Sequence, residues 1–120
     1  MYLEYFLKSI LEPITENFQI DEAILYGSYA KGNANDLSDI DLVIISPEFT
    51  EKSIYANNRI IKNKLKLFIP GLQLSSFSTN SFYNEDFVDT NFIQEIKKTG
   101  KVLYSKVRGL DLSIIHSEHS

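Results

Sequence analysis

Two aspartates and a glycine–serine pair are the residues of this chain whose types and spacing suggest chemistry. Asp39 and Asp41 flank Ile40 in an apolar run, and side chains two apart in a strand share a face, roughly 7 Å apart along the backbone. Carboxylates so placed can chelate Mg²⁺, which prefers few protein carboxylates plus phosphate oxygens and water. Ten residues separate the pair Gly27–Ser28 from Asp39. Glycine lets backbone approach a ligand closely, and serine adds a hydroxyl. We therefore predict a site for a metal-bound polyphosphate.

Lys31 stands one helical turn after Ser28, close enough in sequence to reach toward a bound phosphate. Backbone N–H groups that open the turn are free to bind anionic oxygens. The alternative interpretation is a surface crossover with two solvent-facing aspartates. The joint presence of the glycine, the serine and both aspartates at fixed spacing disfavours it.

Strands and helices must position these residues. Apolar runs predict strands at 20–26, 39–45 and 72–78 and a short edge strand at 102–104. Apolar residues three and four apart predict amphipathic helices at 2–18 and 51–68, with a helical turn at 29–32 and a compact helix at 91–100. Residues 80–91 are predicted to form turns and a short helical segment. The fold class is therefore mixed α+β, with three or four strands and helices packed on one face.

Several single residues predict where these elements end. Pro13 lies inside the first helical pattern and should kink or end that helix near Glu12. Pro47 should end the second strand, because proline has no N–H for a ladder. Asn91 is the expected N-cap of the last helix, and Gly100 is expected at its C′ position.

Length and composition limit the classes of protein. A chain of 120 residues is expected to form one domain, here at 1–108 with a C-terminal tail at 109–120. The net charge of −4 argues against a protein that coats nucleic acid. The absence of cysteine excludes disulfides and thiolate metal sites. No apolar run has membrane-spanning length and the start does not resemble a signal peptide, so the cytoplasm is expected. His116 and His119 could pair on a metal, but a frayed tail is the preferred interpretation.

The stretch from Gly27 to Asp41 resembles the signature of the polymerase-β-like nucleotidyltransferase superfamily: Gly-Ser, ten residues, then Asp-x-Asp. Ala30-Lys31-Gly32 after the turn and Ser38 before the first aspartate extend the resemblance. The element order carries it more loosely over most of the chain and implies the nucleotidyltransferase fold. At this length the chain resembles the minimal, single-domain members, which are often paired with a helical partner of the HEPN class, some as toxin and antitoxin.

The resemblance implies a mechanism and a set of site residues. Asp39 and Asp41 would bind two Mg²⁺ ions, while Gly27 and Ser28 hold phosphates, with Lys31 and Ser38 as further candidate phosphate-binding residues. A hydroxyl of a protein or RNA acceptor would attack the α-phosphorus of a nucleoside triphosphate, with ATP as the expected donor, and pyrophosphate would leave.

One part of the signature is missing. Active members carry a third carboxylate on a later strand, and the equivalent segment here, 72–78, offers Gln73 and Ser75 on its polar face. Gln73 is the position matched to that carboxylate, and its neutral amide cannot take a proton at a useful pKa. Other acids would have to fold back from outside the strand. The candidates are Asp36, Glu85, Asp86 and Asp89.

Two functions of different class therefore remain open. One is an enzyme that transfers a nucleotidyl group, and the other is a weak or inactive member that binds nucleotide and restrains a helical partner. A domain without nucleotide binding is the least favoured. The acceptor and the base cannot be read from the sequence. The helix at 2–18 and the aromatic stretch from Phe77 to Phe92 could carry a homo-oligomer or partner interface, although core packing explains both equally well.

Overall fold

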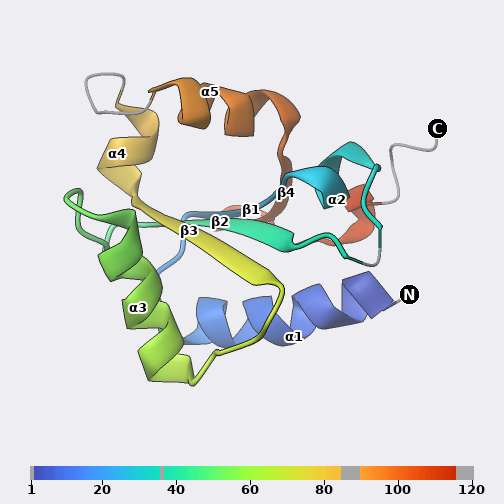
Figure 1. The fold of residues 1–120 in the computed structure, drawn as a ribbon. Coiled ribbons are helices and arrows are strands. Elements are labelled where there is room, and N and C mark those ends of the chain that lie inside the picture. Colours follow the sequence, from blue (N-terminus) through green and yellow to red (C-terminus); the bar gives the residue numbers. More distant parts are fainter. Residues whose placement is uncertain (1, 36, 85–89, 116–120) are drawn as a thin grey trace.

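The computed structural model describes residues 2–35, 37–84 and 90–115, the side chains of Tyr2 and Thr90 excepted. Its elements follow the chain in the order α1 (Tyr2–Asn17), β1 (Glu22–Tyr26), α2 (Ser28–Lys31), β2 (Ile40–Ser46), α3 (Ile54–Leu65), β3 (Leu72–Ser78), α4 (Thr79–Tyr83), α5 (Thr90–Thr99), β4 (Lys101–Ser105) and β5 (Gly109–Leu110). Figure 1 shows the strands side by side in the centre and the helices around them. The mixed α+β class predicted from the sequence is confirmed.

The sheet has five strands in the order β3-β2-β1-β4-β5. Only β2 and β3 are parallel, and α3 makes the crossover between them; the other neighbours are antiparallel. Three or four strands were predicted, so the count was too low. β4 was expected at the edge, yet it lies between β1 and β5. The segment expected to be a tail adds β5 and the buried Leu112 and Ile115.

Helices cover both faces of the sheet, which corrects the prediction of one covered face. On one face α1 and α3 pack against alternate strand residues such as Leu25, Leu42 and Leu74. On the other, α4 and α5 pack against the neighbouring strand residues such as Ile24 and Val43. The second layer escaped prediction because α4 has only five residues and α5 ten, too few for a long periodic pattern.

Pro13 does not end α1, which continues to Asn17. The prediction of a break near Glu12 was wrong because the helix buries Leu7, Ile10, Leu11 and Ile14 at 0–1% exposure. Burying one such side chain contributes about 1.5–3 kcal/mol. Four of them outweigh the cost of about 3 kcal/mol for an interior proline.

The boundaries of α5 also differ from the prediction. The helix begins at Thr90, so Asn91 lies inside it and is not the cap. Gly100 follows the last residue of α5, but its φ is not positive, so it does not adopt the left-handed conformation expected at C′. It is instead a close-packing residue, because a Cβ there would collide with Ile24 Cγ2 and with the Ile96 carbonyl.

Two buried asparagines fix α3 against β3. Asn57 Nδ2 donates to the Ser76 carbonyl at 3.0 Å, and Asn58 Nδ2 donates to the Leu74 carbonyl at 2.8 Å. Asn57 also bonds both ways with the backbone of Thr50, at 2.9 Å and 2.8 Å. These bonds locate α3, and with it the crossover that brings β3 alongside β2.

Candidate active site

The glycine–serine turn joins β1 to α2 in a conformation that only glycine adopts readily. Gly27 has φ 76° and ψ −151°, a region that is essentially reserved for glycine. Its carbonyl accepts from the N–H groups of Ala30 and Lys31, both at 3.1 Å, and so closes the single helical turn that the sequence predicted. Gly32 then ends α2 in the left-handed conformation. Gly27 and Ser28 are half-buried, whereas Lys31 is exposed in the last turn of α2.

The carboxylate of Asp41 lies directly against this turn. A Cβ added to Gly27 would collide with Asp41 Oδ2, so the missing side chain is the space that the carboxylate occupies. Tyr26 and Asp41 are register partners in the antiparallel pair of β1 and β2. The fold thereby brings together two parts of the sequence signature, although they are separated by a whole loop.

Asp39 stands just outside β2, which begins at Ile40, and its side chain is exposed. Its negative charge nevertheless affects the carboxyl of Asp41. Burial is the main cause that raises the pKa of the Asp41 carboxyl, and the negative charge of Asp39 raises it further. The two carboxylates are thus close enough to repel each other, as expected of a pair that a cation would hold together.

Ser38 closes the loop that leads into the pair. Its hydroxyl accepts from the Asn35 N–H at 2.9 Å, and its own N–H donates to the Asn35 carbonyl at 3.0 Å. Asn35 Oδ1 in turn accepts from the Leu37 N–H at 2.8 Å. The Ser38 hydroxyl retains its hydrogen for donation, but its observed role is to shape the loop before Asp39.

Gln73 pairs in register with Asp41 across the parallel strands, so the two side chains share one face of the sheet. Its side chain is exposed, and Ser75, two residues further along, is half-buried. Gln73 therefore completes a row of Tyr26, Asp41 and Gln73 on three neighbouring strands. The other acids considered, Asp36, Glu85, Asp86 and Asp89, lie outside the described residues, as do His116 and His119.

The sequence did not single out α5, which packs next to these residues. Phe92 packs edge-on against Tyr26, with ring centroids 5.5 Å apart. Burial, then the negative charges of Glu95 and Asp41, raise the pKa of the Tyr26 phenol. The signal available in the sequence was the three-residue spacing of Phe92 and Glu95, which places both on one side of the helix.

The residues fit a divalent cation. Asp39 and Asp41 supply hard oxygen ligands, and their mutual repulsion is of the kind that a bound cation relieves. Within the residues that the structure describes, no group of three or more His, Asp or Glu side chains gathers as a metal centre. Asp39 and Asp41 would hold such a cation, and phosphate oxygens and water are further ligands that Mg²⁺ accepts.

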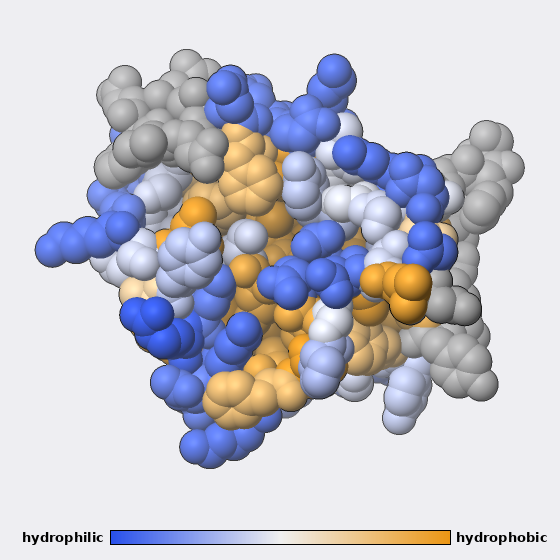
Figure 2. Space-filling view, in the orientation of Figure 1, coloured by the Kyte–Doolittle hydropathy of each residue, from blue (hydrophilic) through white to orange (hydrophobic). Residues whose placement is uncertain are grey.

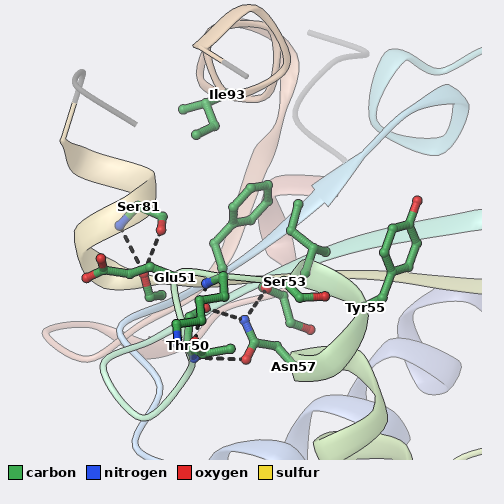
Figure 3. Close-up of a pocket in the computed structure, with 12 residues that line it drawn as sticks. Thr50, Glu51, Ser53, Tyr55, Asn57, Ser81 and Ile93 are labelled. Carbon is green, nitrogen blue, oxygen red and sulfur yellow. Dashed lines mark hydrogen bonds between the residues drawn. The ribbon is translucent and has the colours of Figure 1, made fainter. Parts of the chain in front are cut away.

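A hollow lies near the far end of β3, away from Gln73. Its volume is about 290 Å³, and its lining includes Ser76, Phe77, Ser78 and Ile93. Figure 3 shows hydrogen bonds between the polar groups that line it: Asn57 is bonded as described above, and the Ser78 hydroxyl donates to Ser81 Oγ at 2.8 Å while accepting from its N–H at 3.0 Å. These groups serve the structure, and Asp39 and Asp41 lie away from them at the start of β2.

Two of the described aromatic residues in the stretch that could have carried an interface are interior, whereas Tyr83 is 47% exposed. Phe77 and Phe82 are 4% and 2% exposed and belong to the core beneath α4 and α5. Figure 2 shows hydrophobic side chains across the middle of the viewed face, in the region of β2 and β3, with hydrophilic side chains around them. The structure describes no helix long and apolar enough to cross a membrane among its residues.

Comparison with known proteins supports the geometry. A search of curated proteins finds no significant match. Among solved structures, the chain is similar to a Sulfolobus solfataricus protein that is provisionally named a nucleotidyltransferase, with a TM-score of 0.62 and 17% identity over 88% of this chain and 83% of that one. At this identity the likeness shows the fold. The model of the nucleotidyltransferase domain family matches residues 7–108, which include every residue of the site. The chain therefore belongs to the nucleotidyltransferase domain family.

Proposed function

We propose that this domain transfers AMP from ATP to a hydroxyl group of a protein or RNA acceptor, in a Mg²⁺-dependent reaction. The observation that carries the proposal is the contact between the Asp41 carboxylate and the Gly27 turn. It places a cation ligand beside backbone that can approach phosphate oxygens. Membership of the family supports nucleotidyl transfer in general, and the donor, the metal and the acceptor are our inference.

One group of residues would bind the phosphates, and the two aspartates would bind the metal. Gly27 and Ser28 would hold the phosphates that leave, with Lys31 neutralising charge and Ser38 shaping the entry to β2. Asp39 and Asp41 would hold one or two Mg²⁺ ions, which supply charge neutralisation and orientation of the phosphates. The acceptor oxygen bonds to the α-phosphorus, the bond from that phosphorus to the β-phosphate oxygen breaks, and pyrophosphate departs.

The test is a mass measurement. We expect the purified domain, given ATP, Mg²⁺ and the protein encoded by the neighbouring gene, to add one AMP to that protein. Asp41→Ala should abolish the addition, and Glu16→Ala, an exposed site on α1, should not. An unmodified partner that nevertheless forms a tight complex would count against the transferase.

A second function is favoured by the amide at Gln73. A neutral side chain in register with Asp41 is expected in a domain that binds nucleotide without turnover and restrains a helical partner, such as a HEPN-like protein in a toxin–antitoxin pair. Complex formation that needs neither ATP nor Asp41 would support this function.

A further inference from the structure

We propose that Glu95 is the acceptor-side carboxylate of this site, the group that receives the proton of the attacking hydroxyl. The proposal rests on the transfer reaction proposed above. Its basis is that α5 packs on the face of the sheet on which Tyr26, Asp41 and Gln73 form a row, and that Glu95 follows by three residues Phe92, which contacts Tyr26.

The first step of the argument is the position of α5. Ile93 and Ile96 are 5% and 1% exposed and are packed in the same core as Ile24 and Val43. Gly100 holds the other end of the helix against Ile24, where no side chain fits. The helix is thus anchored at both ends, and its side chains have defined places over the sheet.

The second step is the contact between α5 and the row. Phe92 meets Tyr26 edge-on at a centroid distance of 5.5 Å, and Tyr26 is the register partner of Asp41. Glu95 follows Phe92 by three residues and therefore lies on the same side of the helix. The negative charges of Glu95 and Asp41 both raise the pKa of the Tyr26 phenol, in agreement with the placement that the contact between Phe92 and Tyr26 gives to this side of the helix.

The third step is the chemistry that remains to be done. Transfer to a hydroxyl releases one proton, and general-base assistance contributes about 10²–10⁴-fold to such steps. Gln73 cannot accept a proton, while Asp39 and Asp41 would be engaged by the cation. Glu95 is exposed. It is therefore open to an acceptor that approaches from the surface.

The balanced step assigns each atom. The acceptor oxygen forms its bond to the α-phosphorus as its hydrogen passes to a Glu95 carboxylate oxygen. The bond between the α-phosphorus and the bridging oxygen breaks, and that oxygen leaves with pyrophosphate. Water can replace the acceptor hydroxyl in the same step, which then releases AMP.

The experiment measures binding and chemistry separately, with Mg·ATP as the probe and water as the acceptor. Calorimetry gives the Kd of Mg·ATP, and a coupled assay gives the rate of pyrophosphate release. We expect Glu95→Gln to leave the Kd and the Tm unchanged and to lower the rate by about 10²-fold or more. Glu16→Gln, which removes a carboxylate from an exposed position of α1, is the matched control. A double variant, Glu95→Gln with Gln73→Glu, should recover part of the rate, because it returns a carboxylate to the row.

Three results would overturn the assignment. One is an unchanged rate of pyrophosphate release in Glu95→Gln. A second is a lower rate that is accompanied by a higher Kd for Mg·ATP or a lower Tm. The third is a wild-type domain that binds Mg·ATP but releases no more pyrophosphate than Asp41→Ala, which would favour the binding function. A wild-type domain that does not bind Mg·ATP would instead overturn the proposed function itself, so the two failures are distinguishable.

Discussion

Gly27 has a positive φ that other residues rarely adopt. The Asp41 carboxylate occupies the space that a side chain at this position would need. We expect Gly27→Ala to lower the free energy of unfolding by about 1–3 kcal/mol, the cost of holding a substituted residue in such a region. Because Asp41 Oδ2 must also move, the Kd of Mg·ATP should rise about tenfold or more, equivalent to ~1.4 kcal/mol. Urea unfolding and calorimetry measure the two effects.

Gly109→Ala is the matched control. Gly109 has the same φ of 76°, yet a Cβ there would meet nothing within 4 Å. The variant should lose stability through backbone strain alone and keep the Kd of the parent. Equal binding in the two alanine variants would show that the Gly27–Asp41 contact has no role in the site.

Asp41 provides a test by pH. Burial and Asp39 raise the pKa of its carboxyl in the folded protein, so the ionised form disfavours folding and Asp41→Asn should raise the Tm at pH 7 in metal-free buffer. As the pH falls through the raised pKa, the wild-type carboxyl takes up a proton in the folded state. The gap in Tm should therefore narrow and vanish below the unfolded pKa.

Thermal scans in EDTA from pH 7 to pH 3 measure the gap. In a separate scan at pH 7 in buffer without EDTA, Mg·ATP should reverse the order of the two Tm values, since only the wild-type protein retains the ligand. A gap that does not change with pH would mean that a different property of the asparagine side chain causes it.

The chemistry-bearing residues were predictable to the extent that they are close in sequence. Gly27, Ser28, Asp39 and Asp41 lie within fifteen residues, and two adjacent strands suffice to bring them together. Glu95 could not be predicted in the same way. Its place beside Tyr26 depends on which face of the sheet α5 covers, and this is decided by packing over the whole chain.

At the scale of elements, the α3–β3 contact depends on few side chains. Asn57 is 1% exposed and makes hydrogen bonds to Thr50 and Ser76. We expect Asn57→Ala to lower the free energy of unfolding by about 2–4 kcal/mol, because each buried backbone group left without a partner costs about 1–3 kcal/mol. Asn63→Ala, at an exposed position of the same helix, should change it by less than about 0.5 kcal/mol.

Urea unfolding with a common m-value measures both asparagine variants. Similar small losses would show that the helix is held by its apolar contacts instead. The sequence placed this helix at 51–68, longer than the observed Ile54–Leu65. The excess arose because apolar residues such as Phe68 continue the pattern into the connection, where Phe68 is 64% exposed.

The elements with long apolar patterns were the most predictable. β3 spans Leu72–Ser78 as predicted, and β1 and β2 differ from the prediction only at their ends. The break at Pro13 was wrong because local preference loses to burial. The edge position of β4 was wrong because strand order is set by pairings between residues far apart in sequence, such as Ala23 with Tyr104.

For the whole molecule, the two cores have different relations to the site. Ile14 lies in the core beneath α1 and Ile96 in the core beneath α5, at 0% and 1% exposure. Alanine at either position should lower the free energy of unfolding by about 2–5 kcal/mol. Only Ile96→Ala should also slow pyrophosphate release, by about tenfold, since loosening α5 displaces Glu95 and small displacements cost up to ~10²-fold.

Both alanine variants are compared at a temperature well below their Tm, so that folded protein is assayed in each case. Equal rates would mean that the core beneath α5 supports the fold alone. The sequence could not separate the two cores, because a single strand such as β2 supplies alternate residues to both.

The hydrogen bonds from α3 to β3 also have a consequence between molecules. β3 is the outermost strand on its side of the sheet, and exposed strand backbone can recruit another chain and seed aggregation. Asn57 and Asn58 occupy the carbonyls of Ser76 and Leu74 that an incoming strand would use. On the far side, β5 has only two residues, too few to template a lasting ladder. Asn57 and Asn58 are thus expected to favour solubility as well as stability. Their replacement would leave the backbone carbonyls at the β3 edge available for pairing with another chain.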